Sequence, residues 1–92
     1  MTPDELARAE GPPPTLSPPL LALWWDARND WAAAHAAAQD GEDAESAWVH
    51  AYLHRKEGDL SNAGYWYRRA GRAMPAGTLE AEWRALATAL LA

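Results

Sequence analysis

The sequence contains no cysteine, no phenylalanine and no isoleucine, and Val49 is the single valine among its 92 residues. Without cysteine the chain can form neither a disulfide framework nor a thiolate metal site. The scarcity of β-branched residues leaves little from which a sheet could be built. The abundance of alanine instead favours helix. The sequence therefore predicts an all-α protein, and its length corresponds to one domain.

Positive charge is also scarce, because eight Lys and Arg face 13 Asp and Glu, for a formal net charge of −5. A surface of this sign does not neutralise phosphates, so we expect no nucleic-acid partner and no anionic membrane partner. The N-terminus is acidic and lacks the basic start and apolar run of a secretory signal. No stretch approaches the roughly 20 apolar residues of a membrane span. We therefore expect a cytoplasmic protein.

Proline is concentrated near the N-terminus and divides the chain into two parts. Residues 1–17 form a Pro-rich arm, and residues 18–92 form the helical domain. Residues 2–10 have the capping residues of a short helix, whereas residues 11–19 carry five of the seven prolines and are expected to be extended, as in polyproline II. We expect the arm to lie loosely on the body; the alternative is a proline ligand for a partner with an aromatic groove.

Four longer helices are expected in the second part, each beginning after a residue that can cap it, and the first three end at glycine or proline. Their connections are only a few residues long, which predicts a compact antiparallel four-helix domain. Gly64 and Gly71 would then lie inside a helix, which suggests close contact with another backbone. The predicted helices span about 18–39, 44–57, 60–74 and 79–91.

The segment 44–77 resembles a single tetratricopeptide (TPR) repeat, a helix–turn–helix of about 34 residues. Ala63, Tyr67, Ala70 and Pro75 follow the small–aromatic–small–proline spacing of the repeat, and Gly58-Asp59 stands where its turn belongs. The resemblance implies a TPR-like helical hairpin that binds another protein. The longer string from residue 50 to residue 71 is similar to the core of small Trp-rich microbial proteins, a likeness that implies no activity.

The three histidines form the first candidate site. His50 and His54 are four residues apart and share one helix face, and His35 lies on the preceding antiparallel helix at about the same height. Glu57 follows His54 on the same side. Three imidazoles and a carboxylate are a ligand set for Zn²⁺ or another divalent metal. The alternative is a structural role, in which His50 and His54 form hydrogen bonds with groups such as Asn62 or Tyr67.

The second candidate site is a contact for an anion or a protein partner. At helical spacing Arg68 and Arg72 share one face with Tyr65, and two guanidinium groups beside a phenol can hold a carboxylate or a phosphate. The alternative is a solvated face that pairs with the acids near residues 40–45 or with a second copy of the chain.

These observations predict a non-enzymatic helical module for protein–protein interaction, whose partner is another protein or a second copy, as in a homodimer. We expect no catalytic residues, because no serine lies in a nucleophile elbow and no glycine-rich phosphate loop is present. We also expect no cofactor other than a divalent metal. The competing prediction is a small metal- or ligand-binding protein that uses the histidine cluster.

Overall fold

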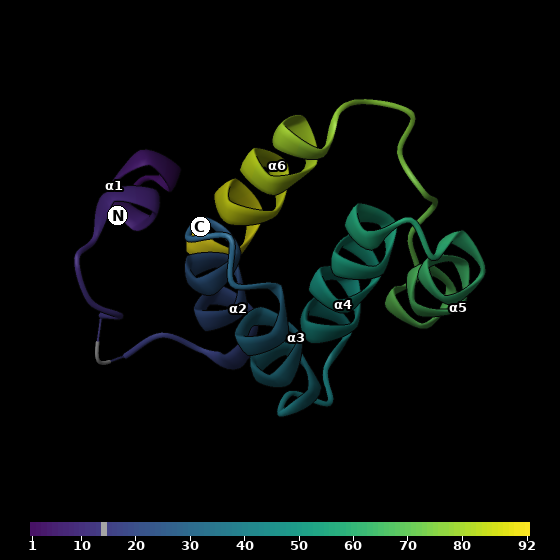
Figure 1. The fold of residues 1–92 in the computed structure, drawn as a ribbon, viewed down its shortest axis with the longest axis horizontal. Helices are drawn as coiled ribbons and strands as arrows, with labels where there is room; N and C mark the ends of the chain where they lie inside the picture. Colours follow the sequence, from purple (N-terminus) through teal and green to yellow (C-terminus); the bar gives the residue numbers. More distant parts are fainter. Residues whose placement is uncertain (14) are drawn as a thin grey trace.

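The computed structural model describes residues 1–13 and 15–92, and every regular element in them is helical (Figure 1). The prediction of an all-α protein is confirmed. The described residues form six helices, because the short helix expected within residues 2–10 is present beside the longer ones and the predicted helix 18–39 is two helices. They are α1 (Pro3–Arg8), α2 (Pro18–Asp26), α3 (Trp31–Gln39), α4 (Ala44–Glu57), α5 (Leu60–Ala70) and α6 (Leu79–Leu91).

The predicted helix 18–39 is wrong, because the chain breaks between α2 and α3. Asn29 has a φ of 61°, in the left-handed region that ends helices. Asp30 then caps α3 by accepting a hydrogen bond from the backbone N–H of Ala33 at 3.0 Å. The break turns α3 back along α2, and the two helices pack against each other.

The end of the predicted helix 60–74 is also wrong, because α5 stops at Ala70. Gly71 has a φ of 71° and is the left-handed residue that terminates the helix. It therefore does not mark a close helix contact. Gly64 does lie inside α5, but a Cβ there would have only the Arg68 Nη1 atom near it, at 3.5 Å. The close backbone approach expected at both glycines is absent.

The N-terminal arm does not lie loosely on the body over residues 3–9. Leu6 of α1 is fully buried in the core. The Asp4 carboxylate accepts a hydrogen bond from Arg84 of α6 at 2.9 Å, and the Trp24 indole donates to the Ala9 carbonyl at 3.0 Å. The extended conformation expected for the proline run includes Pro14, which lies outside the described residues.

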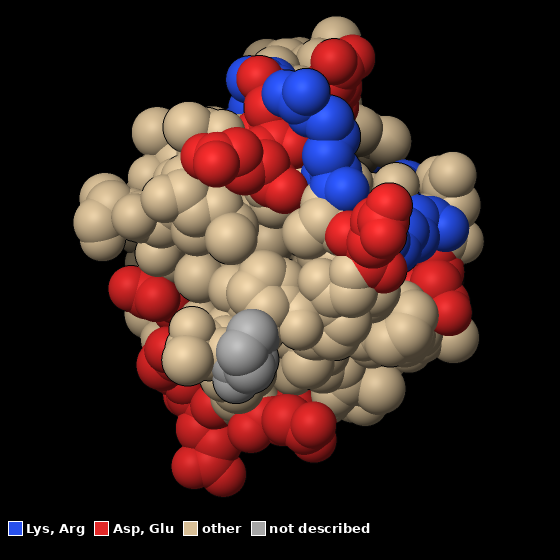
Figure 2. Space-filling model, turned by 90° about the vertical axis from the view of Figure 1, so that its left-hand side faces the viewer, with Lys and Arg blue, Asp and Glu red and all other residues tan. Residues whose placement is uncertain are grey.

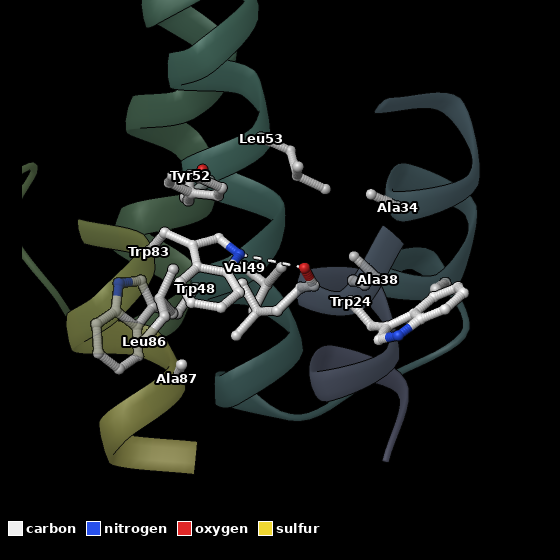
Figure 3. Packing of buried hydrophobic residues seen from close by; sticks show 14 of the residues in the cluster. Trp24, Ala34, Ala38, Trp48, Val49, Tyr52, Leu53, Trp83, Leu86 and Ala87 are labelled. Carbon is white, nitrogen blue, oxygen red and sulfur yellow. Dashed lines mark hydrogen bonds between the residues drawn. The ribbon is translucent and has the colours of Figure 1, made fainter. Parts of the chain in front are cut away.

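Helix α4 is the centre of the fold, with α5 on one side and α2, α3 and α6 on the other (Figure 1). Its ends were predicted correctly: Asp43 accepts the Ser46 N–H at 3.0 Å, and Gly58 ends it with a φ of 90°. All nine residues from Ser46 to His54 are buried. Figure 3 shows the central packing of Val49 and Leu53 beside Ala34 and Ala38.

Two buried carboxylates fix α4 to its neighbours. Asp26 of α2 accepts hydrogen bonds from Tyr52 at 2.6 Å and from Lys56 at 2.8 Å, both on α4. On the other side, Glu82 of α6 accepts one from Arg55 of α4 at 2.8 Å. Burial and the Asp26 carboxylate raise the pKa of Tyr52, which therefore stays a neutral donor. These contacts fix the rotation of α4 about its axis, and so determine the direction in which His50 and His54 point.

Candidate metal centre

The imidazoles of His35, His50 and His54 lie together between α3 and α4, as the sequence predicted. One ring nitrogen of each histidine lies within 4.8 Å of one ring nitrogen of each of the others. The ring centres are 4.5 Å apart for His35 and His50, 5.1 Å for His35 and His54, and 4.8 Å for His50 and His54. The cluster forms because the loop after α3 reverses the chain and because residues 50 and 54 lie one helical turn apart.

Two tryptophans enclose the cluster from opposite sides. The Trp31 ring stacks on His35, with 4.7 Å between centres and 11° between planes. The Trp66 ring stacks on His50, with 3.9 Å between centres and 14° between planes. The Trp31 indole donates a hydrogen bond to the Leu53 carbonyl at 2.8 Å, which fixes its ring. The two indoles limit how far the imidazoles of His35 and His50 can turn.

Glu57 orients one of the three rings. Its Oε2 atom lies 2.6 Å from His54 Nδ1, so the carboxylate accepts the proton of that nitrogen. The Nε2 atom of His54 is then left as the nitrogen with a free lone pair. A carboxylate that holds the far nitrogen of a histidine is the usual outer contact of a metal-binding imidazole. The predicted association of Glu57 with the cluster is therefore present, on its outer side.

The surroundings favour neutral rings at two of the positions. Burial lowers the pKa of His50 to about 4, helped by the neighbouring His35, His54 and Arg69. Burial also lowers the pKa of His35. A metal binds the neutral form of imidazole, so these two rings need not lose a proton near pH 7 before they coordinate.

The imidazole rings of His35 and His50 form no hydrogen bond within residues 1–13 and 15–92. Of the expected partners, Tyr67 donates its hydroxyl proton to Glu82 at 2.5 Å, and no hydrogen bond of the described residues joins the Asn62 side chain to a histidine. The expectation that His50 is satisfied by Asn62 or Tyr67 is therefore wrong. Among the described residues, the one fully buried side-chain polar atom without a hydrogen-bond partner is Ser46 Oγ. The unpartnered nitrogens of His35 and His50 are therefore not fully buried, and they keep some contact with solvent.

The donor set fits a first-row divalent metal. Zn²⁺ holds imidazole nitrogens at about 2.0–2.1 Å, which in a tetrahedron puts them about 3.4 Å apart. The nitrogens of the cluster are within 4.8 Å of one another, so rotations that move them by about 1 Å would suffice. Three protein nitrogens leave a fourth position for water or another ligand, and this is the arrangement of open zinc sites. Glu57 is available to orient His54 or to join the ligands.

The second predicted site is not assembled as expected. Arg72 lies over the Trp48 ring, with 3.4 Å from its guanidinium carbon to the ring centre. Arg69, rather than Arg68, donates to the Tyr65 hydroxyl at 3.3 Å. Arg68 is exposed on α5. The ion pairs found among the described residues involve none of these three arginines.

Sequence reasoning missed the two tryptophans and Arg69 as neighbours of the cluster. Trp31 could have been found, because it precedes His35 by one helical turn and therefore shares its face. Trp66 and Arg69 gave no such signal, since their position depends on how α5 packs on α4.

Charge is unevenly distributed on the face shown in Figure 2. Basic side chains gather with acids at one end, and a separate acidic group lies at the opposite end. No helix of the described residues has the length and hydrophobicity to cross a bilayer. Comparison of the chain with protein-family models, curated proteins and solved structures found no match.

Proposed function

We propose that this protein binds a divalent first-row transition metal, with Zn²⁺ as the first candidate, through His35, His50 and His54. The observation that supports this most directly is the contact of three imidazoles, two of which lack any hydrogen-bond partner among the described residues. The free nitrogens of these two rings keep some contact with solvent, so a ligand can reach them. A bound cation would satisfy all three rings at once, and Glu57 would orient His54 toward it.

Metal titration of the metal-free protein tests the proposal. We expect one equivalent of Zn²⁺ to bind and to raise the melting temperature by mass action. Co²⁺ serves as a spectroscopic substitute, because four-coordinate Co²⁺ absorbs visible light strongly and six-coordinate Co²⁺ does not. Failure of the wild-type protein to bind Zn²⁺, Ni²⁺ or Co²⁺ more tightly than about 100 µM, about −5 kcal/mol, would remove the proposal.

Variants separate the site from non-specific binding. His35→Gln removes a half-buried ligand and is expected to weaken Zn²⁺ binding by more than about tenfold, while Glu57→Gln is expected to weaken it by about 10–100-fold. Glu45→Gln is the matched control, because Glu45 is an exposed acid on the same helix and lies outside the cluster. Equal affinities for all three variants would show that the histidine cluster is not the site.

The second candidate function is the protein–protein interaction module predicted from the TPR-like segment 44–77. The observation in its favour is that two large apolar residues of α5, Leu60 and Tyr65, expose 58% and 46% of their surface. Light scattering at increasing concentration tests self-association, and Tyr65→Ser should weaken it. A cytoplasmic location also stays a prediction.

A further inference from the structure

A cavity of about 500 Å³ lies over the first turns of α4, between the end of α3 and the second half of α5. Its size is that of a pocket for a small organic molecule. Ala47 and His50 of α4 line it, together with Ala38 of α3 and Trp66 of α5. His50 thus belongs both to the histidine cluster and to the wall of this cavity.

Charges of opposite sign line the cavity from different elements. Glu42 and Asp43 come from the loop between α3 and α4, and Arg69 comes from α5. The Arg69 guanidinium carbon lies 4.9 Å from the centre of the Trp66 ring, so the stacked indole holds it at the cavity wall.

Neither Arg69 nor Glu42 is neutralised by a partner within the described residues. None of the ion pairs found there includes either residue. The one polar contact of the Arg69 side chain there is its hydrogen bond to the Tyr65 hydroxyl, and Glu42 has none. Asp43 differs, because it also caps α4. The guanidinium and the Glu42 carboxylate are therefore both available to a ligand.

This arrangement disfavours ligands of a single charge. An anion that pairs with Arg69 would also meet the carboxylates of Glu42 and Asp43, and a cation that pairs with these acids would meet Arg69. A ligand with both signs would pair with both sides and lay its hydrocarbon part against Ala38, Ala47 and Trp66.

We propose that this cavity binds a small zwitterion, a compound with a carboxylate and an ammonium group joined by a short hydrocarbon chain. The carboxylate pairs with Arg69, and the ammonium group pairs with Glu42 and Asp43. The site needs no metal, because its charged contacts are Arg69, Glu42 and Asp43; of the proposed metal ligands it shares His50 but neither His35 nor His54. It therefore stands or falls separately from the proposed metal centre.

Unbranched ω-amino acids are the probes, because their chain length varies the separation of the two charges. Metal-free protein is titrated by calorimetry with the series from β-alanine to 6-aminohexanoate, and the indole N–H signal of Trp66 is followed by nuclear magnetic resonance. We expect one length to bind best and to shift that signal. Valerate and pentylamine, each with a single charge, should bind at least about tenfold more weakly than 5-aminovalerate.

Substitutions identify the contacts. Arg69→Gln should weaken the best probe by about tenfold or more, and Glu42→Gln by about threefold, since Asp43 remains. Arg68→Gln is the matched control, because Arg68 is an exposed arginine of the same helix that does not line the cavity. Thermal melts verify that each variant is folded.

Three outcomes would overturn the proposal. The first is that no probe binds at about 10 mM, which corresponds to about −3 kcal/mol. The others are that valerate or pentylamine binds as well as the zwitterions, or that Arg69→Gln binds the best probe as tightly as Arg68→Gln does. Metal binding distinguishes this failure from failure of the metal centre. His35→Gln should lose Zn²⁺ and keep the zwitterion, whereas Arg69→Gln should lose the zwitterion and keep Zn²⁺.

Discussion

Replacing Glu82 by Gln removes one negative charge from the junction of three helices without changing the shape of the side chain. Glu82 is 5% exposed. Its carboxylate accepts hydrogen bonds from the Trp48 indole at 3.3 Å, the Tyr67 hydroxyl at 2.5 Å and the Arg55 guanidinium at 2.8 Å. The three donors come from α4 and α5, so this one side chain joins both helices to α6.

The cost of the substitution follows from what it leaves behind. The Arg55 side chain is 14% exposed and would lose its charged partner. The amide of Gln also turns an N–H group toward one of the three donors, which then lacks an acceptor. Breaking a buried ion pair by removing one partner costs about 3–5 kcal/mol. We therefore expect the free energy of unfolding to fall by about that amount.

Urea denaturation followed by circular dichroism measures the change, with the slope of the transition checked for two-state behaviour. Asp4→Asn is the matched control, because Asp4 pairs with Arg84 on the surface, where both side chains are about half exposed. Exposed pairs contribute little to stability, so no measurable loss is expected there. A Glu82→Gln variant as stable as Asp4→Asn would refute the buried-anchor argument.

Three further predictions concern the histidines, the arm and the loop before α4. The metal-free protein should lose stability as the pH falls from about 6.5 to about 4. The reason is that the pKa of His50 is about 4 in the folded protein, so the unfolded chain binds more protons in that range. The free energy of unfolding should fall by up to about 3 kcal/mol, and a His50→Gln variant with the same acid profile would contradict the prediction. Leu6→Ala should cost about 2–5 kcal/mol in thermal or urea unfolding, because Leu6 is fully buried, whereas a loosely attached arm would show no change. Gly41→Ala should cost about 1–3 kcal/mol by the same assays, because its Cβ would lie 1.9 Å from Ser46 Oγ, and a fully stable variant would show that this contact relaxes freely.

The sequence predicted the elements whose ends carry local signals. Helix α4 was predicted from Asp43 to Gly58, and its ends are the capping residue and the left-handed glycine that the pattern implied. Helix α6 was predicted equally well from Thr78, whose side chain accepts the N–H of Ala81. At both ends of α4 and at the start of α6, the capping hydrogen bonds join residues three or four positions apart, so neighbouring residues decide the boundary.

The break within the predicted helix 18–39 and the end of the predicted helix 60–74 are both marked by local residues in the sequence. The hydrophobic periodicity continues past these residues and favoured longer helices. Asn29-Asp30 combines a residue that tolerates the left-handed region with a strong helix cap, which marks the break between α2 and α3. The predicted helix 60–74 includes Gly71, because Pro75 also terminates helices. The glycine ends α5 four residues earlier, since it adopts a positive φ at little cost.

The candidate site was predictable only in part, for a related reason. The meeting of His35, His50 and His54 follows from the helical period and one reversal of the chain. The stacking of Trp66 on His50 depends on the rotation of α5 against α4, which long-range packing sets. The buried acids Asp26 and Glu82 were also missed, because an acidic residue is usually exposed unless a partner distant in the sequence neutralises it.

These buried acids bear on the histidines through the geometry of α4. Tyr52 and Lys56 are held by Asp26, and Arg55 is held by Glu82, so α4 is fixed on two sides around the turn that carries His54. A helix fixed in this way keeps His50 and His54 beside His35. The protein therefore holds three rings in contact, and the proposed metal would meet a site already assembled.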